Sequence, residues 1–387
     1  MGFEHYIRSG SKMLRCGYTT GTCAALAAAG AAAGLLTGVF PQQVALITPK
    51  GLRVEVPLLE TSRDGGSASC AVRKDAGDDP DVTDGILVYA RVSRRERGFV
   101  IDGGEGVGRV TKPGLDQPVG AAAINSVPRR MIAAAAAEVC AEAGYPGGLE
   151  IVISAPEGRE RAARTFNPYL GIEGGISILG TSGIVEPMSE QALVDTIAVE
   201  AHQAATADRS GLILTPGNYG ADFLAQLSGP IRSLPCVRFS NYLGDAIDIA
   251  VHEGFEKVII VGHIGKLVKL AGGIMNTHSH FADCRRELFC AHAAVCGADR
   301  ETCQALLDTV TTDDCLAVLD RAGLRQPVLE RLLQAMQWQL DRRAGGTLPI
   351  GAVVFSNVYG LLGLTETART LLEQMGGEIL PDLGVSQ

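Results

Sequence analysis

The sequence predicts a two-domain protein that combines an α+β domain over residues 1–172 with a three-layer, Rossmann-like α/β domain over residues 173–387. Its 387 residues are enough for about two domains, and 46% of them are hydrophobic, which is enough to fill two cores. Strand-like segments follow one another in the first part of the chain. In the second part, strands alternate with glycine-containing loops and helices, a pattern that is typical of parallel sheets.

The first domain begins with a polar loop over residues 14–22 and an alanine-rich helix from Cys23 to about Leu36. Thr20 or Thr22 is suited to cap this helix, and capping is a simpler role for these hydroxyls than anion binding. Five later segments alternate in polarity or carry β-branched residues, and they predict an antiparallel sheet. These segments are 44–48, 52–59, 67–74, 86–93 and 98–101.

Two loops of this domain have unusual compositions. Residues 74–84 contain five aspartates, but their spacing does not match a helix–loop–helix calcium site, so we expect a solvated loop or the polar wall of a cleft. Residues 103–114 are rich in glycine. A dinucleotide fingerprint needs a helix directly afterwards, and Lys112-Pro113-Gly114 prevents one, which leaves a flexible, ligand-facing loop as the functional interpretation.

The second domain is predicted from five short apolar strands, each followed by a polar loop. These strands are 176–179, 212–214, 237–239, 258–261 and 353–355. Their loops should lie at one edge of a mainly parallel sheet, where doubly wound sheets bind ligands. Helices at about 281–294, 299–308, 312–322 and 327–343 form an insertion, residues 281–345, before the final strand.

The segment Lys257–His280 carries the densest group of polar residues near a predicted strand end. A glycine turn follows the strand, and a helix is expected from Lys266 to Met275 with Lys266 and Lys269 on one face. These cations favour an anion over a metal. His278 and His280 are two residues apart and not four, which also disfavours a zinc site, so we expect no metal ligands.

Composition excludes several classes of function. The formal charge of −9 disfavours a nucleic-acid surface, although it allows a local basic pocket for an acidic small molecule. No run of 18 apolar residues predicts a membrane span, and no signal-peptide pattern is present. The ten cysteines lack paired spacing, as expected for reduced thiols of a cytoplasmic protein.

Several motifs together resemble one known family. They are LRCGYTTGTCAA (14–25), KDAGDDPDVT (74–83), GVGRVTKPGL (106–115), AINSVPRRMI (123–132), TFNPYLGIEGGISILGTSGIVEPM (165–188), TPGNYG (215–220) and GHIGKLVKLAGGIMNTHS (262–279). This combination is similar to the cobalt-precorrin-5B C(1)-methyltransferase family (CbiD) of the anaerobic cobalamin pathway. One departure is visible, because Ala121-Ala122 stands where the family tends to carry Glu-Pro.

The resemblance implies methyl transfer from S-adenosylmethionine to ring carbon 1 of cobalt-precorrin-5B, a macrocycle with several carboxylates. The cobalt belongs to the substrate. We therefore expect the cofactor in three loops, with His263 and His278 as candidates for proton handling. The candidate cofactor residues are Gly180, Thr181, Ser182, Gly183, Thr215, Gly217, Asn218, Gly220 and Asn241. The candidate substrate residues are Thr19, Thr20, Lys112, Arg129, Lys266, Lys269, Thr277 and Ser279.

Two alternatives come from other classes. A non-catalytic corrinoid or tetrapyrrole carrier needs one pocket and not two, so the repeated glycine loops argue against it. An enzyme acting on phosphate ligands would need a phosphate-binding loop, and the six-residue glycine separation of that motif is missing before Lys266. The sequence is also compatible with a homo-oligomer.

Overall fold

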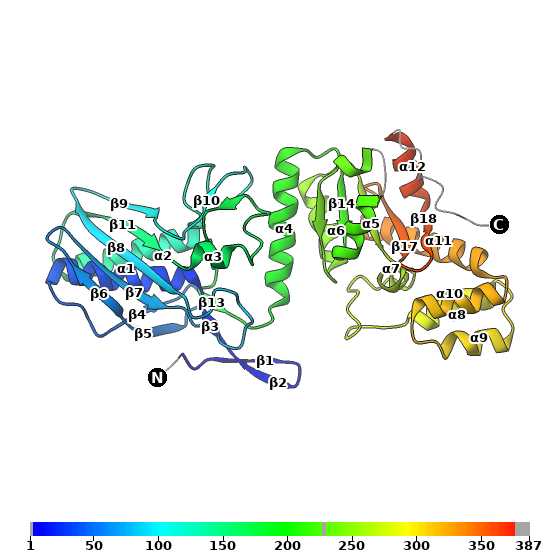
Figure 1. The fold of residues 1–387 in the computed structure, drawn as a ribbon, viewed down its shortest axis with the longest axis horizontal. Helices are drawn as coiled ribbons and strands as arrows, with labels where there is room; N and C mark the ends of the chain where they lie inside the picture. Colours follow the sequence, from blue (N-terminus) through cyan, green and yellow to red (C-terminus); the bar gives the residue numbers. More distant parts are fainter. Residues whose placement is uncertain (1–2, 227–229, 376–387) are drawn as a thin grey trace. The chain divides into compact units, whose positions relative to one another are not determined.

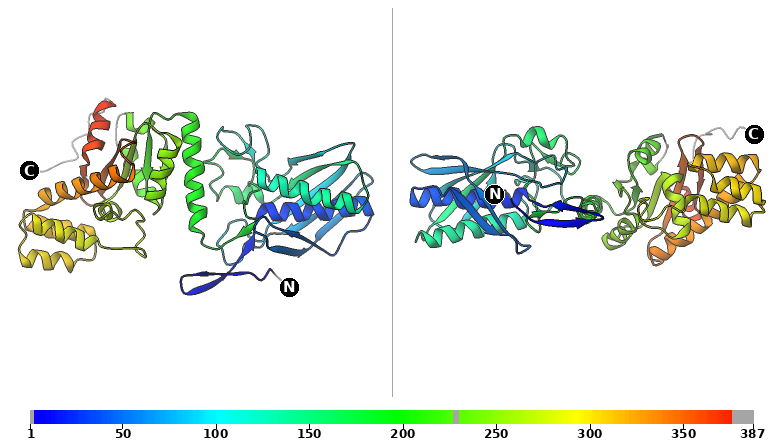
Figure 2. Two further views of the ribbon diagram at one scale, coloured as in Figure 1. Left: turned by 180° about the vertical axis from the view of Figure 1, so that it is seen from behind. Right: turned by 90° about the horizontal axis from the view of Figure 1, so that it is seen from below.

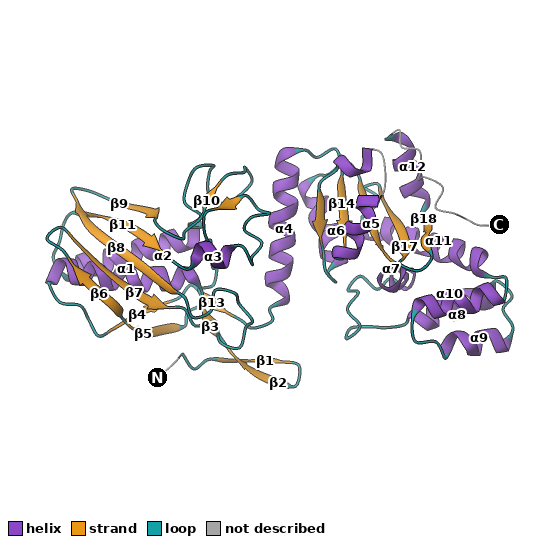
Figure 3. Cartoon of the chain, viewed as in Figure 1, coloured by secondary structure: helices purple, strands orange, loops and turns teal. Residues whose placement is uncertain are grey.

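The computed structural model describes residues 3–226 and 230–375 and forms two compact units, Met1–Glu190 and Gln191–Gln387. Both units combine helices with sheets (Figure 1), and the separate sheets are visible in Figure 3. The mixed α and β class expected from the sequence is therefore confirmed.

The first unit is built on a five-stranded sheet covered on one face by two helices. Its strands, in spatial order, are β6 (Leu59–Arg63), β7 (Ser67–Arg73), β8 (Leu87–Arg95), β11 (Gly148–Ser154) and β9 (Phe99–Gly103). The β11–β9 pair is parallel and the other pairs are antiparallel. Helices α1 (Thr20–Thr37) and α2 (Ser126–Glu142) lie side by side (Figure 2) and enclose the core with this sheet.

Helix α1 is apolar on all sides because it lies in the centre of its unit. Its small side chains allow close approach, and Thr19 caps its first turn by accepting a hydrogen bond from the Thr22 N–H at 3.2 Å. By length and composition the helix could cross a membrane, which the sequence analysis did not expect. However, 78% of it is buried within the protein, as in the core helix of a globular unit.

Shorter elements complete the first unit. They are β1 (Tyr6–Ser9) paired with β2 (Lys12–Arg15), β3 (Gly17–Tyr18) with β13 (Ile184–Val185), β4 (Gln43–Ile47) with β5 (Arg53–Pro57), β10 (Arg109–Val110) with β12 (Ile172–Glu173), and helix α3 (Gly158–Ala162). The predicted segments 44–48 and 52–59 therefore form a hairpin of their own. They do not join the larger sheet, which is a correction of the expected arrangement.

Residues 173–190 also require a correction, because the sequence analysis placed them in the second domain. Ile176 bridges to Val107, and Ile178 bridges to Ile124. These partners lie in the first unit, so the predicted strand 176–179 is not the first strand of the second sheet. The contact boundary falls at residue 190 and not near 172.

The second unit is built on another five-stranded sheet. In spatial order its strands are β15 (Cys236–Arg238), β14 (Leu212–Thr215), β16 (Val258–His263), β17 (Ile350–Ser356) and β18 (Gly360–Leu364). The first four are parallel and β18 is antiparallel to β17. Numbered along the chain, the order is 2-1-3-4-5, so the direction of winding reverses between β14 and β16.

Helices cover both faces of this sheet, and alternate strand residues point to opposite faces. Val258 and Ile260 join a core with α4 (Glu190–Ala207), α6 (Leu243–Glu253) and α11 (Arg325–Arg343). Ile259 and Val261 join a second core with α5 (Asn218–Gln226) and α12 (Glu366–Gln374). The unit therefore has three layers, with helices on both sides of the sheet, and loops follow the ends of the strands.

The segment between β16 and β17 is helical. It contains α7 (Ile264–Leu267), η2 (Val268–Gly272), α8 (Arg285–Val295), α9 (Arg300–Leu307) and α10 (Thr312–Arg321), followed by α11; a short turn, η1 (Pro230–Ser233), precedes β15. Helices α8 to α11 lie close to the ranges expected from the sequence. The helix expected over 266–275 is instead α7 and a 3₁₀ turn, which ends where Gly273 adopts a left-handed conformation (φ 76°).

Candidate binding site at the carboxyl edge of the second sheet

The four parallel strands of the second unit end at one edge, and each end places a polar residue there. These residues are Thr215, Arg238, His263 and Ser356. The winding reverses between β14 and β16, and in such sheets this position leaves a crevice at the carboxyl ends of the strands. Thr215 and His263 lie on the two strands that flank it.

The loop after β14 contains residues that shape it and residues that face outward. Thr215 is fully buried and its Oγ1 donates to the Gly217 carbonyl at 3.2 Å. A Cβ on Gly220 would overlap the Thr215 Oγ1, whereas one on Gly217 would meet no atom within 4 Å. Thr215 and Gly220 therefore fix the turn, and Gly217 and Asn218 are exposed enough to reach a ligand.

Two asparagines are oriented by their neighbours as hydrogen-bond donors. The Oδ1 of Asn218 accepts from Arg238 Nη1 at 3.1 Å. The Oδ1 of Asn241 accepts from Lys266 Nζ at 3.0 Å and from Thr277 Oγ1 at 3.2 Å. Neither amide nitrogen has a partner within residues 3–226 and 230–375, so both are available to oxygen atoms of a ligand.

Lys266 supplies the positive charge next to Asn241. Its ammonium donates to the Ser240 carbonyl and to Asn241 Oδ1, both at 3.0 Å, and it retains a third N–H. Burial lowers the pKa of Lys266, and the nearby Lys269 lowers it further. Lys266, Asn241 and Thr277 are therefore brought together, whereas the sequence analysis assigned Asn241 to the cofactor and the other two to the substrate. Thr277 is buried.

Lys269 has a different position from the one expected. Only 2% of it is exposed, and its ammonium donates to the carbonyls of Thr277 at 2.9 Å and Ala282 at 2.8 Å. It therefore anchors the segment that follows the site. Lys266 lies in α7 and Lys269 in the 3₁₀ turn η2, so the single helix expected to carry both lysines is not formed.

The histidines differ in burial. His263 is half-buried, and its Nδ1 accepts from the Gly265 N–H at 3.0 Å. His278 and Ser279 are exposed, and His278 Nδ1 accepts from the His280 N–H at 3.1 Å. Among the described residues, no hydrogen bond joins His278 to Lys266 or Asn241. Of the two candidate histidines, only His263 lies at a strand end.

The loop Gly180–Gly183 lies in the first unit, which is a correction because it was expected beside the loops of the second sheet. A Cβ on Gly180 would overlap Thr19, and the Gly183 carbonyl accepts from Thr22 Oγ1 at 2.7 Å. Thr181 is exposed, and Ser182 Oγ donates to the Ile184 carbonyl at 3.0 Å. This loop therefore packs against the start of α1.

The candidate substrate residues of the first unit also have structural partners. Thr20 Oγ1 accepts from the Leu179 N–H at 3.0 Å and is buried with Thr19. The Arg129 guanidinium donates to the carbonyls of Ile124 and Ile101, both at 2.8 Å, and burial lowers its pKa. Lys112 is exposed and donates to the Tyr169 carbonyl at 3.3 Å. Of these four, Lys112 is the most accessible to a ligand.

The glycine-rich stretch near residue 106 is a packed junction, although a flexible, ligand-facing loop was expected. Gly106 has a φ of 72°, and a Cβ there would overlap the Ala155 carbonyl oxygen. A Cβ on Gly158 or Gly175 would overlap the Gly106 carbonyl oxygen. Three backbone segments therefore meet at Gly106, Gly158 and Gly175.

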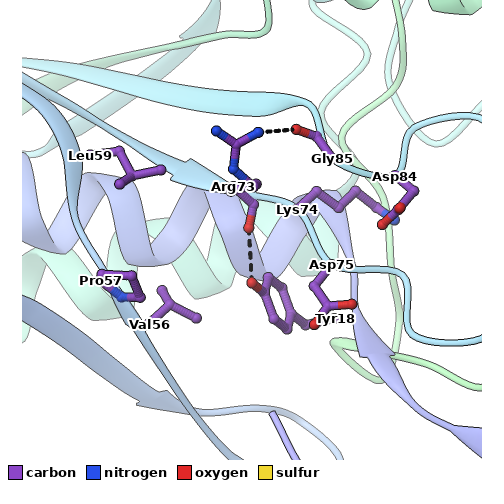
Figure 4. A pocket seen from close by; sticks show the side chains of 9 residues that line it. All are labelled: Tyr18, Val56, Pro57, Leu59, Arg73, Lys74, Asp75, Asp84 and Gly85. Carbon is purple, nitrogen blue, oxygen red and sulfur yellow. Dashed lines mark hydrogen bonds between the residues drawn. The ribbon is translucent and has the colours of Figure 1, made fainter. Parts of the chain in front are cut away.

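The acidic loop, for which the polar wall of a cleft was one of two interpretations, borders a cavity of about 440 Å³ (Figure 4). Val56, Pro57 and Leu59 line one side of it, and Tyr18, Arg73, Lys74, Asp75, Asp84 and Gly85 line the rest. Lys74 is buried and pairs with Asp81 at 2.6 Å. Although burial opposes the shift, Lys74 lowers the pKa of Asp81. The Lys74–Asp81 pair accounts for one of the five aspartates as part of the loop's own structure. The lining of the cavity comes from segments far apart in the sequence, so no local pattern indicates it.

Within the described parts of the chain, no three His, Cys, Asp or Glu side chains are grouped to hold a metal ion.

The strand ends and loops described above make the second unit an α/β unit with a polar, partly cationic site at the carboxyl edge of its sheet. Such a site suits a small ligand with acidic groups.

Comparisons with known proteins identify the family. The model of the CbiD family matches residues 7–187, and the model of the CbiD C-terminal domain matches residues 276–366. A cobalt-precorrin-5B C(1)-methyltransferase from Ruminiclostridium cellulolyticum is 47% identical over 92% of this chain and 92% of its own length. Another from Alkaliphilus metalliredigens is 42% identical over 98% of this chain and 100% of its own length.

The chain belongs to the CbiD family, and the resemblance inferred from its motifs is confirmed. A crystal structure of a cobalamin biosynthesis protein (cbiD) from Archaeoglobus fulgidus is 31% identical, covers 72% of this chain and 87% of that chain, and superposes with a TM-score of 0.39.

Proposed function

We propose that this protein methylates ring carbon 1 of cobalt-precorrin-5B in cobalamin biosynthesis, with S-adenosylmethionine as the methyl donor. The observation that carries the proposal is the 47% identity to a cobalt-precorrin-5B C(1)-methyltransferase over 92% of both chains. The reaction would take place in the cytoplasm. The cobalt is part of the macrocyclic substrate and is not held by the protein.

The carboxyl edge of the second sheet suits the methyl donor. Gly217 leaves open space beside the end of β14, and the amide nitrogens of Asn218 and Asn241 are available as donors. A ribose and a carboxylate offer the oxygen acceptors that such amides bind. We therefore infer a Rossmann-like domain whose cofactor lies between β14 and β16, in keeping with the 2-1-3-4-5 order.

The methyl donor supplies an electrophilic methyl group on a sulfonium centre. This chain's own contribution is to hold the donor and the substrate in position and to exclude water. The sulfonium charge largely disappears in the transition state, so fixed geometry contributes most to the rate. Lys266 would bind a substrate carboxylate through its third N–H as a charge-assisted pair.

The proposal is tested by single-turnover assays with methyl-¹³C-labelled S-adenosylmethionine and purified cobalt-precorrin-5B. We expect the labelled methyl group on ring carbon 1, detected by NMR of the product. Heat-denatured protein is the control for non-enzymatic transfer. If the macrocycle binds tightly and no label is transferred, the protein is a carrier and the proposal is wrong.

A further inference from the structure

The ring of His263 is held in one position at the end of β16. Its Nδ1 accepts the Gly265 N–H at 3.0 Å. Its plane is nearly perpendicular to the ring of Phe355, at 89° with centroids 5.7 Å apart, and Phe355 stacks on Phe223 at 4.2 Å. A side chain restrained by a hydrogen bond and a packed aromatic pair is suited to present its remaining nitrogen to a ligand.

The hydrogen bond from Gly265 fixes the tautomer of this ring. A nitrogen that accepts an N–H carries no proton, so in the neutral imidazole the proton lies on Nε2. A doubly protonated ring has no acceptor and would lose the Gly265 bond. Burial lowers the pKa of His263. The negative charge of Asp313 acts in the other direction and raises it, but the net shift is downward. Ser356 holds Asp313 through a 2.7 Å hydrogen bond.

We propose that His263 is a neutral hydrogen-bond donor whose Nε2–H binds a carboxylate of the ligand, and not the base that the sequence suggested. The proposal rests on the proposed function. Among residues 3–226 and 230–375, Nε2 has no hydrogen-bond partner. Two ligands carry carboxylates here, namely the methionine part of the methyl donor and the acetate or propionate groups of the macrocycle.

The tautomer is measured without any ligand by ¹⁵N NMR of the full-length protein, with the His263 signals assigned by their loss in His263→Asn. At pH 7 and above we expect Nε2 protonated and Nδ1 unprotonated in most of the molecules. The midpoint of protonation should lie below the ordinary imidazole pKa of about 6.5, because burial lowers the folded-state pKa. A proton on Nδ1 at pH 7, in either the other tautomer or the cation, would overturn the proposal.

Binding of the ligand is tested with two variants that separate the nitrogens. In His263→Asn, the amide oxygen replaces Nδ1 as the acceptor for Gly265, and the Nε2 donor is lost. In His263→Gln, the longer amide returns a donor near the Nε2 position. We expect about tenfold weaker binding for His263→Asn and substantial recovery for His263→Gln.

Calorimetry with S-adenosylhomocysteine and, separately, with cobalt-precorrin-5B identifies which carboxylate is bound. A loss confined to S-adenosylhomocysteine assigns the methyl donor, and a loss confined to the macrocycle assigns the substrate. Unchanged affinity for both ligands in His263→Asn refutes the donor role and leaves the proposed function intact. Failure of the wild-type protein to bind either ligand refutes the proposed function as well.

Discussion

Replacing Gly106 with Ala is expected to destabilise the first unit strongly. The residue has a φ of 72°, and a Cβ there would overlap the Ala155 carbonyl oxygen. A left-handed non-glycine residue costs about 1–2 kcal/mol, and overpacking adds about 1–3 kcal/mol or more. A backbone carbonyl cannot turn away as a flexible side chain can. We expect a total loss of about 4 kcal/mol, a large share of a typical unfolding free energy.

Gly120→Ala is the matched control for this substitution. Its φ is 89°, but a Cβ would meet no atom within 4 Å, so only the backbone cost of about 1–2 kcal/mol applies. Hydrogen exchange of β8 and β11, read by mass spectrometry, measures the stability of the first unit. Equal protection in the two variants would show that the junction of Gly106, Gly158 and Gly175 is not tightly packed.

Replacing Lys269 with Met is expected to release the segment between Thr277 and Ala282. The substitution keeps most of the buried aliphatic volume and removes two charge-assisted hydrogen bonds to backbone carbonyls. Bonds to charged groups contribute about 1.5–3 kcal/mol each, while the cost of burying the ammonium disappears. We therefore expect a net local loss of about 3 kcal/mol and at least tenfold faster exchange of amides 277–282.

Lys266→Met serves as the matched control, because that lysine bonds to Ser240 and Asn241 instead. It should leave exchange within 278–282 nearly unchanged and should weaken binding of the macrocycle. If Lys269→Met leaves the exchange rates unchanged and weakens macrocycle binding, Lys269 is a substrate ligand, as its sequence context suggested.

The central strand and the helical insertion could be predicted because their signals are local. Val258–Val261 is an uninterrupted apolar run that is buried on both faces, and the periodicity of α8 to α11 gives each helix a core-facing side. Capping by the threonines before α1 was also inferable, since hydroxyls at a helix start have a local role. Thr19, and not Thr20 or Thr22, is the cap.

The segment 176–179 was misassigned for a physical reason. An apolar tetrapeptide followed by a glycine loop looks the same whether its partners precede or follow it in the chain. Ile176 and Ile178 bridge to Val107 and Ile124, which are more than fifty residues earlier, and no local pattern encodes such pairing. Because this segment belongs to the first unit, that unit extends to residue 190, past the predicted boundary near 172.

Buried cations were the other source of error. Lys269 lies in a glycine-containing stretch and Arg129 at the start of a helix, and the sequence analysis assigned both to substrate carboxylates. Backbone carbonyls brought together by folding take that place in the structure. The sequence shows which side chains carry charge, but it does not show which carbonyls the fold turns toward them. Asn218, Asn241 and Lys266 remain candidates because each keeps an N–H that no described residue accepts.

The location of S-adenosylhomocysteine in a crystal of the full-length protein tests the account most directly. We expect its density at the carboxyl edge of the second sheet, beside Gly217 and Asn218 and within hydrogen-bond reach of Asn241. Density in the cavity of the first unit beside Arg73, or at the Gly180–Gly183 loop, would contradict the assignment of the methyl-donor site to the crevice between β14 and β16.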